Sequence, residues 1–268
     1  MADTSTSIKC YATSPTHDND QGFRHSRTIM AAFAEGCKGQ VVPPTKLFDG
    51  PAALYGILRG TGEIIRHCEW VGRDYYYIDH GYLKPGHYDG YYRVTKNARQ
   101  ADIPDPREFV YPADRLKKVG VDVRPWKRTG RNVLVIPVTG AVGEFYGINP
   151  DQWLRVVTDE ITSHTARPIE VKHKGIGAID EAMKDTWCVV THSSNSAVDA
   201  LINGVPVITL GESACETMSW EFKDIEHPWW PERELWLQAL AYSQFTLSEM
   251  RNGIAWKILN HERGSVSQ

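Results

Sequence analysis

One stretch of 24 residues, 187–210, constrains the fold more than any other part of the chain: it reads WCVVTHSSNSAVDALINGVPVITL. The apolar runs at its two ends, 187–190 and 205–210, have the length and composition of strands buried on both faces. Between them, apolar residues at helical spacing predict a helix that begins near Ser194 and stops at residues 203–204. The order strand, helix, strand is a βαβ unit, which places its ligands at the carboxyl ends of parallel strands.

The turn before this helix is polar throughout. It offers hydroxyl, imidazole and amide groups in a row, at Thr191, His192, Ser193, Ser194, Asn195 and Ser196. A helix N-terminus carries unpaired N–H groups and the positive end of the helix dipole, and both attract phosphate or carboxylate. The same residue types also cap helices without binding any ligand. The turn alone therefore leaves both interpretations open.

The residues that follow favour ligand binding over simple helix capping. The pattern Asp-Ala-Leu-x-x-Gly-x-Pro-Val-Ile after the serine-rich turn resembles the nucleotide-sugar half of GT-B glycosyltransferases. In that family the turn and helix hold the donor diphosphate, and an acidic residue of the helix often binds ribose. The resemblance assigns that position to Asp199, one carbon shorter than the more usual Glu. It also implies a UDP-sugar donor, with no metal and no tightly bound cofactor. Nucleotide-sugar epimerases share this fold and are a minor alternative.

Strand and helix patterns alternate along most of the chain, which predicts an α/β protein of two Rossmann-like domains with a cleft between them, as in the GT-B fold. A length of 268 residues suffices for two small cores. In the first half we expect strands at 8–12 and 75–78, a helix at 21–35 that Gly36 stops, and a weak helix at 50–60. The expected parts are an acceptor domain at 1–114, a basic linker at 115–131, a nucleotide-sugar domain at 132–240, and a helix at 241–268 that packs back on the first domain.

Further donor-binding groups are predicted at the end of a strand over 169–174. Lys172, His173 and Lys174 stand there, and cations near a phosphate-binding turn suit a diphosphate, both in binding it and in stabilising it as a leaving group. The alternative is an ordinary solvent-exposed strand tip.

Candidate catalytic residues lie in the first half. Asp79 and His80 precede Gly81 at the predicted carboxyl end of the 75–78 strand, and His25 stands near the start of the first helix. An Asp–His pair in a strand-end loop can deprotonate an acceptor hydroxyl. Asp79 can equally serve only the local turn by bonding to backbone.

An acceptor surface is predicted after that strand. Tyr91, Tyr92, Arg93 and Asn97 suit stacking on a base or a sugar, although an amphipathic hairpin edge explains them equally well. Residues 115–131 then hold seven cations, with Asp114 and Asp122 as the only nearby acids, and Lys127 and Arg128 are the expected phosphate contacts.

The Tyr-rich segments are similar to small phage-type transferases, some of which glycosylate hydroxymethylated bases in DNA. This resemblance implies bacteriophage DNA modification, with duplex DNA carrying 5-hydroxymethylcytosine as the acceptor and an extruded target base. One competing interpretation is a capsule or surface-polysaccharide glycosyltransferase. Another is a non-catalytic module that binds nucleotide sugar or nucleic acid. The sugar, the anomeric outcome and the oligomeric state are not readable from these residues.

Composition indicates the cellular compartment and the kinds of partner to expect. Five widely spaced cysteines without a C-x-x-C pair predict a reducing compartment and no structural zinc. A net charge of −3 argues against non-specific electrostatic binding along polyanions such as nucleic acids. No charged-then-apolar leader opens the chain and no apolar run approaches ~20 residues, so we expect no membrane partner and a cytoplasmic location, in the host cytoplasm if phage-encoded.

Overall fold

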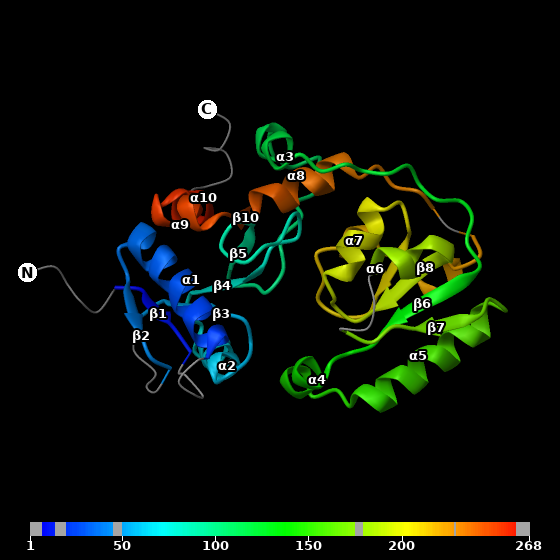
Figure 1. Cartoon of the computed structure of the whole chain (residues 1–268), viewed down its shortest axis with the longest axis horizontal. Coiled ribbons are helices and arrows are strands. Elements are labelled where there is room, and N and C mark those ends of the chain that lie inside the picture. Colours follow the sequence, from blue (N-terminus) through cyan, green and yellow to red (C-terminus); the bar gives the residue numbers. More distant parts are fainter. Residues whose placement is uncertain (1–6, 14–19, 45–49, 175–178, 228, 261–268) are drawn as a thin grey trace, which may run out of the picture. The chain divides into compact units, whose positions relative to one another are not determined.

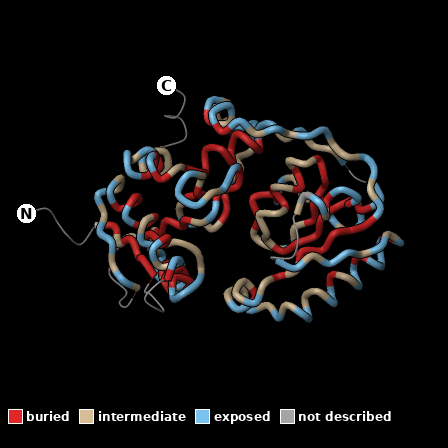
Figure 2. Tube along the Cα trace, in the orientation of Figure 1, coloured by how far each residue is buried: buried red, intermediate tan, exposed pale blue. Residues whose placement is uncertain are grey.

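The computed structural model confirms an α/β protein with two sheets rich in parallel strands. One compact unit comprises residues 1–120 and 235–268, and the other comprises residues 121–234. In both, most residues of the inner strands are buried, and further buried residues lie on the helices (Figure 2). The residues that the structure describes are 7–13, 20–44, 50–174, 179–227 and 229–260.

The first unit is built on a six-stranded sheet with the order β10-β5-β4-β3-β1-β2 (Figure 1). Strands β2, β1, β3 and β4 run parallel to one another. Strand β5 runs antiparallel to both β4 and β10. The bounds are β1 Lys9–Tyr11, β2 Gln40–Val42, β3 Ala52–Tyr55, β4 Tyr75–His80, β5 Tyr92–Lys96 and β10 Gln244–Phe245.

The helices of this unit pack their apolar residues against the sheet. Ile29, Met30 and Phe33 of the first helix are almost fully buried in the core that Tyr76, Ile78 and Phe245 also form. Asp20 accepts a hydrogen bond from the Phe23 amide and so caps that helix. The helices are α1 Gln21–Cys37, α2 Thr61–Val71, α3 Asp114–Val119, α8 Glu234–Tyr242, α9 Leu247–Arg251 and α10 Ile254–Asn260. The first residue of α8, Glu234, is the last residue of the second unit.

The second unit is built on an all-parallel sheet with the order β7-β6-β8-β9. Asn149 caps its long helix, and Pro150 occupies the first turn as the sequence predicts. The strands are β6 Asn132–Ile136, β7 Ile169–Val171, β8 Thr186–Thr191 and β9 Val207–Thr209; the helices are α4 Gly140–Tyr146, α5 Pro150–His164, α6 Ile179–Ala182 and α7 Ser196–Ile202, with short 3-10 turns at Met183–Asp185, Glu216–Met218 and Phe222–Asp224.

Two local predictions are wrong. Residues 50–60 form strand β3 and a turn rather than a helix, because residues 52–54 are buried between β1 and β4 in the middle of the sheet. Gly36 does not end α1, which continues to Cys37 and ends at Lys38 in the left-handed conformation. Helical spacing of apolar residues in 50–60 is thus a coincidence, since a strand buried on both faces needs no alternation.

Candidate functional site

The second unit gathers its polar loops at one edge of its sheet. All four strands are parallel, so their carboxyl ends meet there. Strand β7 lies beside β6 on one side of the β6–β8 pair, and β9 lies beside β8 on the other side. The strand order thus proceeds in opposite directions from this pair. The loops after β6 and β8 therefore flank the topological switch point, where open α/β sheets bind their ligands.

The loop after β8 is the predicted phosphate-binding turn, and hydrogen bonds fix its first residues. The Thr191 hydroxyl donates to the Ile136 carbonyl at 3.0 Å, which ties the end of β8 to the end of β6. Nδ1 of His192 lies 3.0 Å from the Ser193 hydroxyl. The side chains of Thr191 and His192 are buried, whereas Ser193 is half-buried. Thr191 is therefore an anchor, and the groups that can reach a ligand begin at Ser193.

Packing explains the orientation of His192. Its ring lies 5.1 Å from the ring of Tyr146, centroid to centroid. On another side it covers Gly211, where an added Cβ would overlap the imidazole. Burial lowers the pKa of His192 below its ordinary value. A neutral imidazole can donate one hydrogen bond to a phosphate, but it adds no positive charge.

The end of the turn differs from the expectation. Helix α7 begins at Ser196, two residues later than predicted, and Ser194 accepts a hydrogen bond from the Ser196 amide at 3.2 Å. Asn195 is the last residue before the helix and its side chain does not cap α7. Because α7 has only seven residues, its dipole is small, and the groups that this turn offers to a ligand are the half-buried hydroxyl and amide side chains of residues 193–196.

Positive charge at this edge comes from the end of β7. The Lys172 amide donates to the Val135 carbonyl at 2.9 Å, so the chain stays paired to β6 for one residue beyond the strand. His173 and Lys174 follow and are exposed. These three residues lie at the same sheet edge as the turn, although β6 separates β7 from β8.

Asp199 lies in α7, half-buried, at the same end of the unit. Burial raises the pKa of the Cys215 thiol, and the carboxylate of Asp199 raises it further. Asp199 is thus close to the loop that follows β9. Its contact with a ribose stays a prediction.

In the first unit, three histidines gather at the corresponding edge. The ring of His25 lies 4.7 Å from that of His87 and 6.5 Å from that of His80, and the rings of His80 and His87 are 5.6 Å apart. They come from α1, from the last residue of β4 and from the loop between β4 and β5. The rings of three tyrosines lie against His25, namely Tyr55, Tyr88 and Tyr92.

His25 is the buried member of this cluster. Only 7% of its surface is exposed; its Nε2 lies 3.4 Å from the Tyr92 hydroxyl, and its Nδ1 is buried without a hydrogen-bond partner. Burial, followed by the charges of His87 and His80, lowers the pKa of His25 to about 4. The imidazole is therefore neutral near pH 7.

His80 is the accessible member. Its side chain is exposed, and its Nε2 lies 3.4 Å from the hydroxyl of Tyr55. Burial raises the pKa of Tyr55 well above its ordinary value, and the carboxylate of Asp79 raises it further. Tyr55 therefore stays protonated, and its hydroxyl is a hydrogen-bond partner of the exposed His80 ring.

Asp79 has a different environment from the one expected. It stands directly opposite Arg93 in the β4–β5 pair and binds that guanidinium at 2.9 Å. It also accepts hydrogen bonds from the Tyr77 hydroxyl at 2.7 Å and the His80 amide at 2.8 Å. Burial raises the pKa of Asp79, but the charge of Arg93 and these hydrogen bonds lower it below its ordinary value overall. Such a carboxylate is a weak base and mainly neutralises Arg93.

The predicted acceptor surface is not an open one. Tyr92 is fully buried and Arg93 is 7% exposed. Asn97 accepts from the Tyr75 amide at 2.8 Å and donates to Asp74 at 2.7 Å, so it organises a turn. Tyr91 is half-buried and Asn97 is exposed. Strand β5 pairs antiparallel with β4 on one side and with β10 on the other, and contact of these residues with an acceptor stays a prediction.

The basic segment 115–131 is also less open than predicted. Arg115 lies within α3 and is buried against Glu249, so this part belongs to the first unit. Lys127 donates to the carbonyls of Met183 and Lys184. Arg128 lies over the Trp230 ring, 5.3 Å from its centroid. Arg115 and Lys127 are thus engaged within their own units, whereas the other five cations of the segment are exposed: Lys117, Lys118, Arg124, Arg128 and Arg131.

Sequence reasoning missed Tyr55 and His87. Tyr55 was assigned to a helix, and His87 lies in a glycine-rich loop with no motif around it. The closest match to an acidic metal-binding motif is Asp18-Asn-Asp20; Asp18 and Asn19 lie outside the described residues, and Asp20 caps α1. Within the described part of the chain, no cluster of three His, Cys, Asp or Glu side chains is arranged to hold a metal ion. None of the helices described is both long and apolar enough to span a bilayer.

Comparisons with known proteins were made for both sequence and structure. No known protein family and no curated protein matches the sequence. Among solved structures, Thermosulfurimonas dismutans KpsC, beta Kdo 2,7 transferase, is similar with a TM-score of 0.49 and 12% identity, over 95% of this chain and 99% of that chain. The KpsC beta Kdo 2,4 transferase of the same organism is similar with a TM-score of 0.46 and 11% identity, over 88% of this chain and 91% of that chain.

Proposed function

We propose that this protein is a glycosyltransferase that takes a sugar from a nucleotide-sugar donor and transfers it to a hydroxyl group of a glycan. The observation that carries the proposal is the polar turn 191–196 at the switch point of an all-parallel sheet. The nucleotide-sugar-type sequence follows this turn directly, and Lys172 and Lys174 supply positive charge at the same edge.

In this proposal the second unit stabilises the leaving group. The hydroxyl groups of Ser193 and Ser194 and the amide of Asn195 hydrogen-bond the donor phosphate. The lysines after β7 offset the negative charge that grows on it as the bond from the anomeric carbon to the phosphate oxygen breaks. The nucleotide departs with that electron pair, and the acceptor oxygen forms the new bond to the anomeric carbon.

The first unit supplies the general base. His80 is exposed, neighbours a protonated Tyr55 and stands at the carboxyl edge of a parallel-rich sheet. It accepts the proton of the acceptor hydroxyl as that oxygen attacks. His25 is the second candidate, since it is neutral near pH 7 but buried. Asp79 is the weakest, because its oxygens already accept three hydrogen bonds.

A glycan fits as acceptor better than duplex DNA does. A DNA reader needs exposed cations for the phosphates and an open aromatic surface for the base. Here Lys127 is engaged within the second unit, and Tyr92 and Arg93 are buried within the first. Tyr92, Arg93 and Lys127, on which the DNA interpretation depended, are therefore engaged, and Arg128 is the exposed exception.

Donor binding is the direct test. Replacing Ser194 and Asn195 together by Ala should weaken nucleotide-sugar binding by about 1–3 kcal/mol, roughly 5- to 150-fold, because hydrogen bonds to a charged group are lost. Calorimetry with a panel of UDP-sugars and CMP-Kdo measures this. Thr162→Ala with Ser163→Ala, on α5 of the same unit, is the matched control and should leave the affinity unchanged.

Two outcomes would contradict the proposal. Equal donor affinity in a folded Ser194→Ala/Asn195→Ala variant would remove the turn from the donor site. Donor binding without transfer to any hydroxyl acceptor would indicate a binding module instead. Incubation with hydroxymethylated DNA beside a set of oligosaccharides, followed by mass spectrometry of both, identifies the acceptor class.

A further inference from the structure

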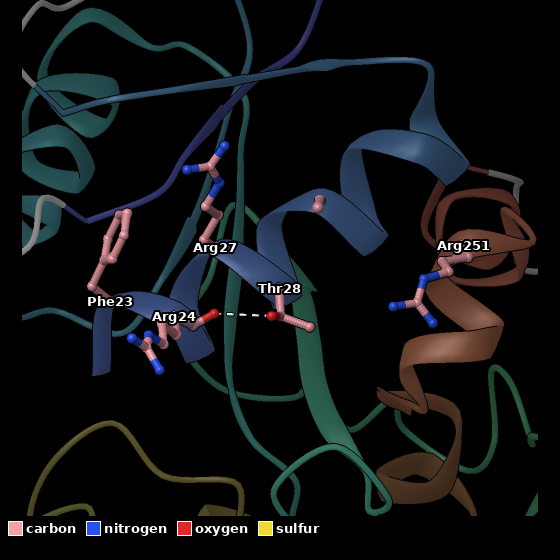
Figure 3. A pocket seen from close by; sticks show the side chains of 6 residues that line it. Phe23, Arg24, Arg27, Thr28 and Arg251 are labelled. Carbon is pink, nitrogen blue, oxygen red and sulfur yellow. Dashed lines mark hydrogen bonds between the residues drawn. The ribbon is translucent and has the colours of Figure 1, made fainter. Parts of the chain in front are cut away.

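A groove on the first unit carries three arginines and has no role in the chemistry above. It has a volume of about 500 Å³ and lies between two helices. Figure 3 shows Arg251 reaching from α9 towards α1. Helix α1 supplies the other five lining residues, which are Phe23, Arg24, Arg27, Thr28 and Ala31.

Two of the three arginines give this groove an accessible positive charge. No acidic side chain lines it. Arg27 and Arg251 are exposed, and neither forms an ion pair with any residue in the described part of the chain. Since the chain as a whole carries a net charge of −3, this local excess of guanidinium groups is a property of the groove.

The two walls of the groove are held rigidly. Gly36 of α1 packs so closely on the Met250 carbonyl of α9 that an added Cβ would overlap it. Thr246 and Glu249 form a reciprocal capping box at the start of α9. Arg251 follows Met250 directly, so its backbone is fixed beside α1. A groove between rigid walls offers its charges without a further cost of ordering the backbone.

We propose that this groove binds the carboxylate or phosphate groups of an acidic glycan, and so receives a segment of the acceptor. The inference rests on the proposed function. Guanidinium forks pair in a bidentate manner with such oxyanions, and the partly buried ring of Phe23 offers an apolar surface to a sugar ring. Helix α1 carries His25 on its buried face and these arginines on its exposed face, so one element links the groove to the histidine cluster.

The test compares two charge-matched double variants of the full chain. Arg27→Ala/Arg251→Ala alters the groove, whereas Arg66→Ala/Lys257→Ala removes the same charge from α2 and α10. Binding of oligogalacturonate, a neutral malto-oligosaccharide and inorganic phosphate is measured by calorimetry without donor. The groove variant should bind oligogalacturonate at least about tenfold more weakly, because charge-assisted hydrogen bonds are lost, and the control should change by less than about twofold.

A third variant and a measurement of donor affinity distinguish the remaining outcomes. Arg27→Lys/Arg251→Lys should recover only part of the affinity, because lysine keeps the charge but lacks the fork. Equal losses in both alanine variants, or no preference of the protein for oligogalacturonate over the neutral chain, would overturn the proposal. Binding of phosphate without oligogalacturonate would overturn the glycan assignment. Donor affinity is unaffected by these changes in either case, so the donor-turn experiment fails or succeeds independently.

Discussion

The two units share a strand order but place their functional groups differently. In chain order, the parallel strands of each sheet are arranged second, first, third, fourth: β2-β1-β3-β4 in the first unit and β7-β6-β8-β9 in the second. In the second unit, most polar groups at the carboxyl edge of the sheet come from one loop of six residues, 191–196. The first assembles its edge from α1, β3, β4, β5 and the loop between β4 and β5.

The chemistry of the two edges differs accordingly. Hydroxyl, amide and ammonium groups at residues 172–174 and 193–195 suit a phosphate that gains charge during the reaction. The first unit instead surrounds imidazoles with tyrosine rings, and burial keeps His25 neutral near pH 7. Under the proposed function, one scaffold serves a leaving group in one unit and a proton acceptor in the other. Three changes in the first unit test this division.

The largest effect is expected on turnover. His80→Ala should lower the transfer rate by ~10²–10⁴-fold, the range in which general bases contribute, and leave donor affinity unchanged because the donor turn is in the other unit. His25→Ala, measured beside it, shows which imidazole acts. His67→Ala on α2 is the histidine control. Full activity of the His80 variant with loss in the His25 variant would move the base to the buried ring.

The second effect is on stability. Asp79→Asn removes the charge opposite Arg93, which is 7% exposed, and should lower the free energy of unfolding by about 3 kcal/mol because a buried cation loses its partner. Urea unfolding followed by circular dichroism measures this. Glu63→Gln, which disturbs an exposed pair with Arg66, is the control and should cost under about 1 kcal/mol. An unchanged stability with abolished transfer would instead return Asp79 to the catalytic residues.

The smallest effect is on the pH dependence of stability. The pKa of His25 is about 4 in the folded protein and 6.5 in its ordinary state. Because the unfolded chain binds this proton more tightly, the stability is complete above pH 6.5 and is lost as the pH falls towards 4. Between pH 7 and pH 5 the loss should be about 2 kcal/mol. His25→Gln should flatten the curve by that amount; parallel curves for both proteins would show that His25 does not titrate as its burial implies.

Elements with a single local cause were predictable. The βαβ unit around 187–210, the capped helix after Asn149 and the strand before Gly81 each follow from the residues within them. Strand β3 was not predictable from the sequence, because its apolar run is short and its strand conformation depends on pairing with β1 and β4 at its two sides. The helix end at Gly36 failed for a related reason, since that glycine makes room for the Met250 carbonyl and does not end the helix.

The same distinction applies to the sites. His25 was identifiable near the start of a predicted helix and His80 at the end of a predicted strand, but their proximity to His87 depends on how α1 and the β4–β5 loop meet. The cations of 115–131 were visible in the sequence, whereas their partners Glu249, Trp230 and the carbonyl of Met183 are more than 50 residues away along the chain. Spacing along the sequence cannot reveal whether such a charge is free.

The sequence by itself determined the α/β class, the position of the polar turn and the nature of the groups in it, because strand burial, helix spacing and turn chemistry act within a few residues. Only the tertiary structure decided which ionisable groups are buried, paired or exposed. Asp79 became a partner of Arg93 through strand pairing, His25 became neutral through burial, and Arg27 and Arg251 came to face one groove through helix packing. Desolvation and Coulomb interactions depend on distance in space, and the fold sets that distance.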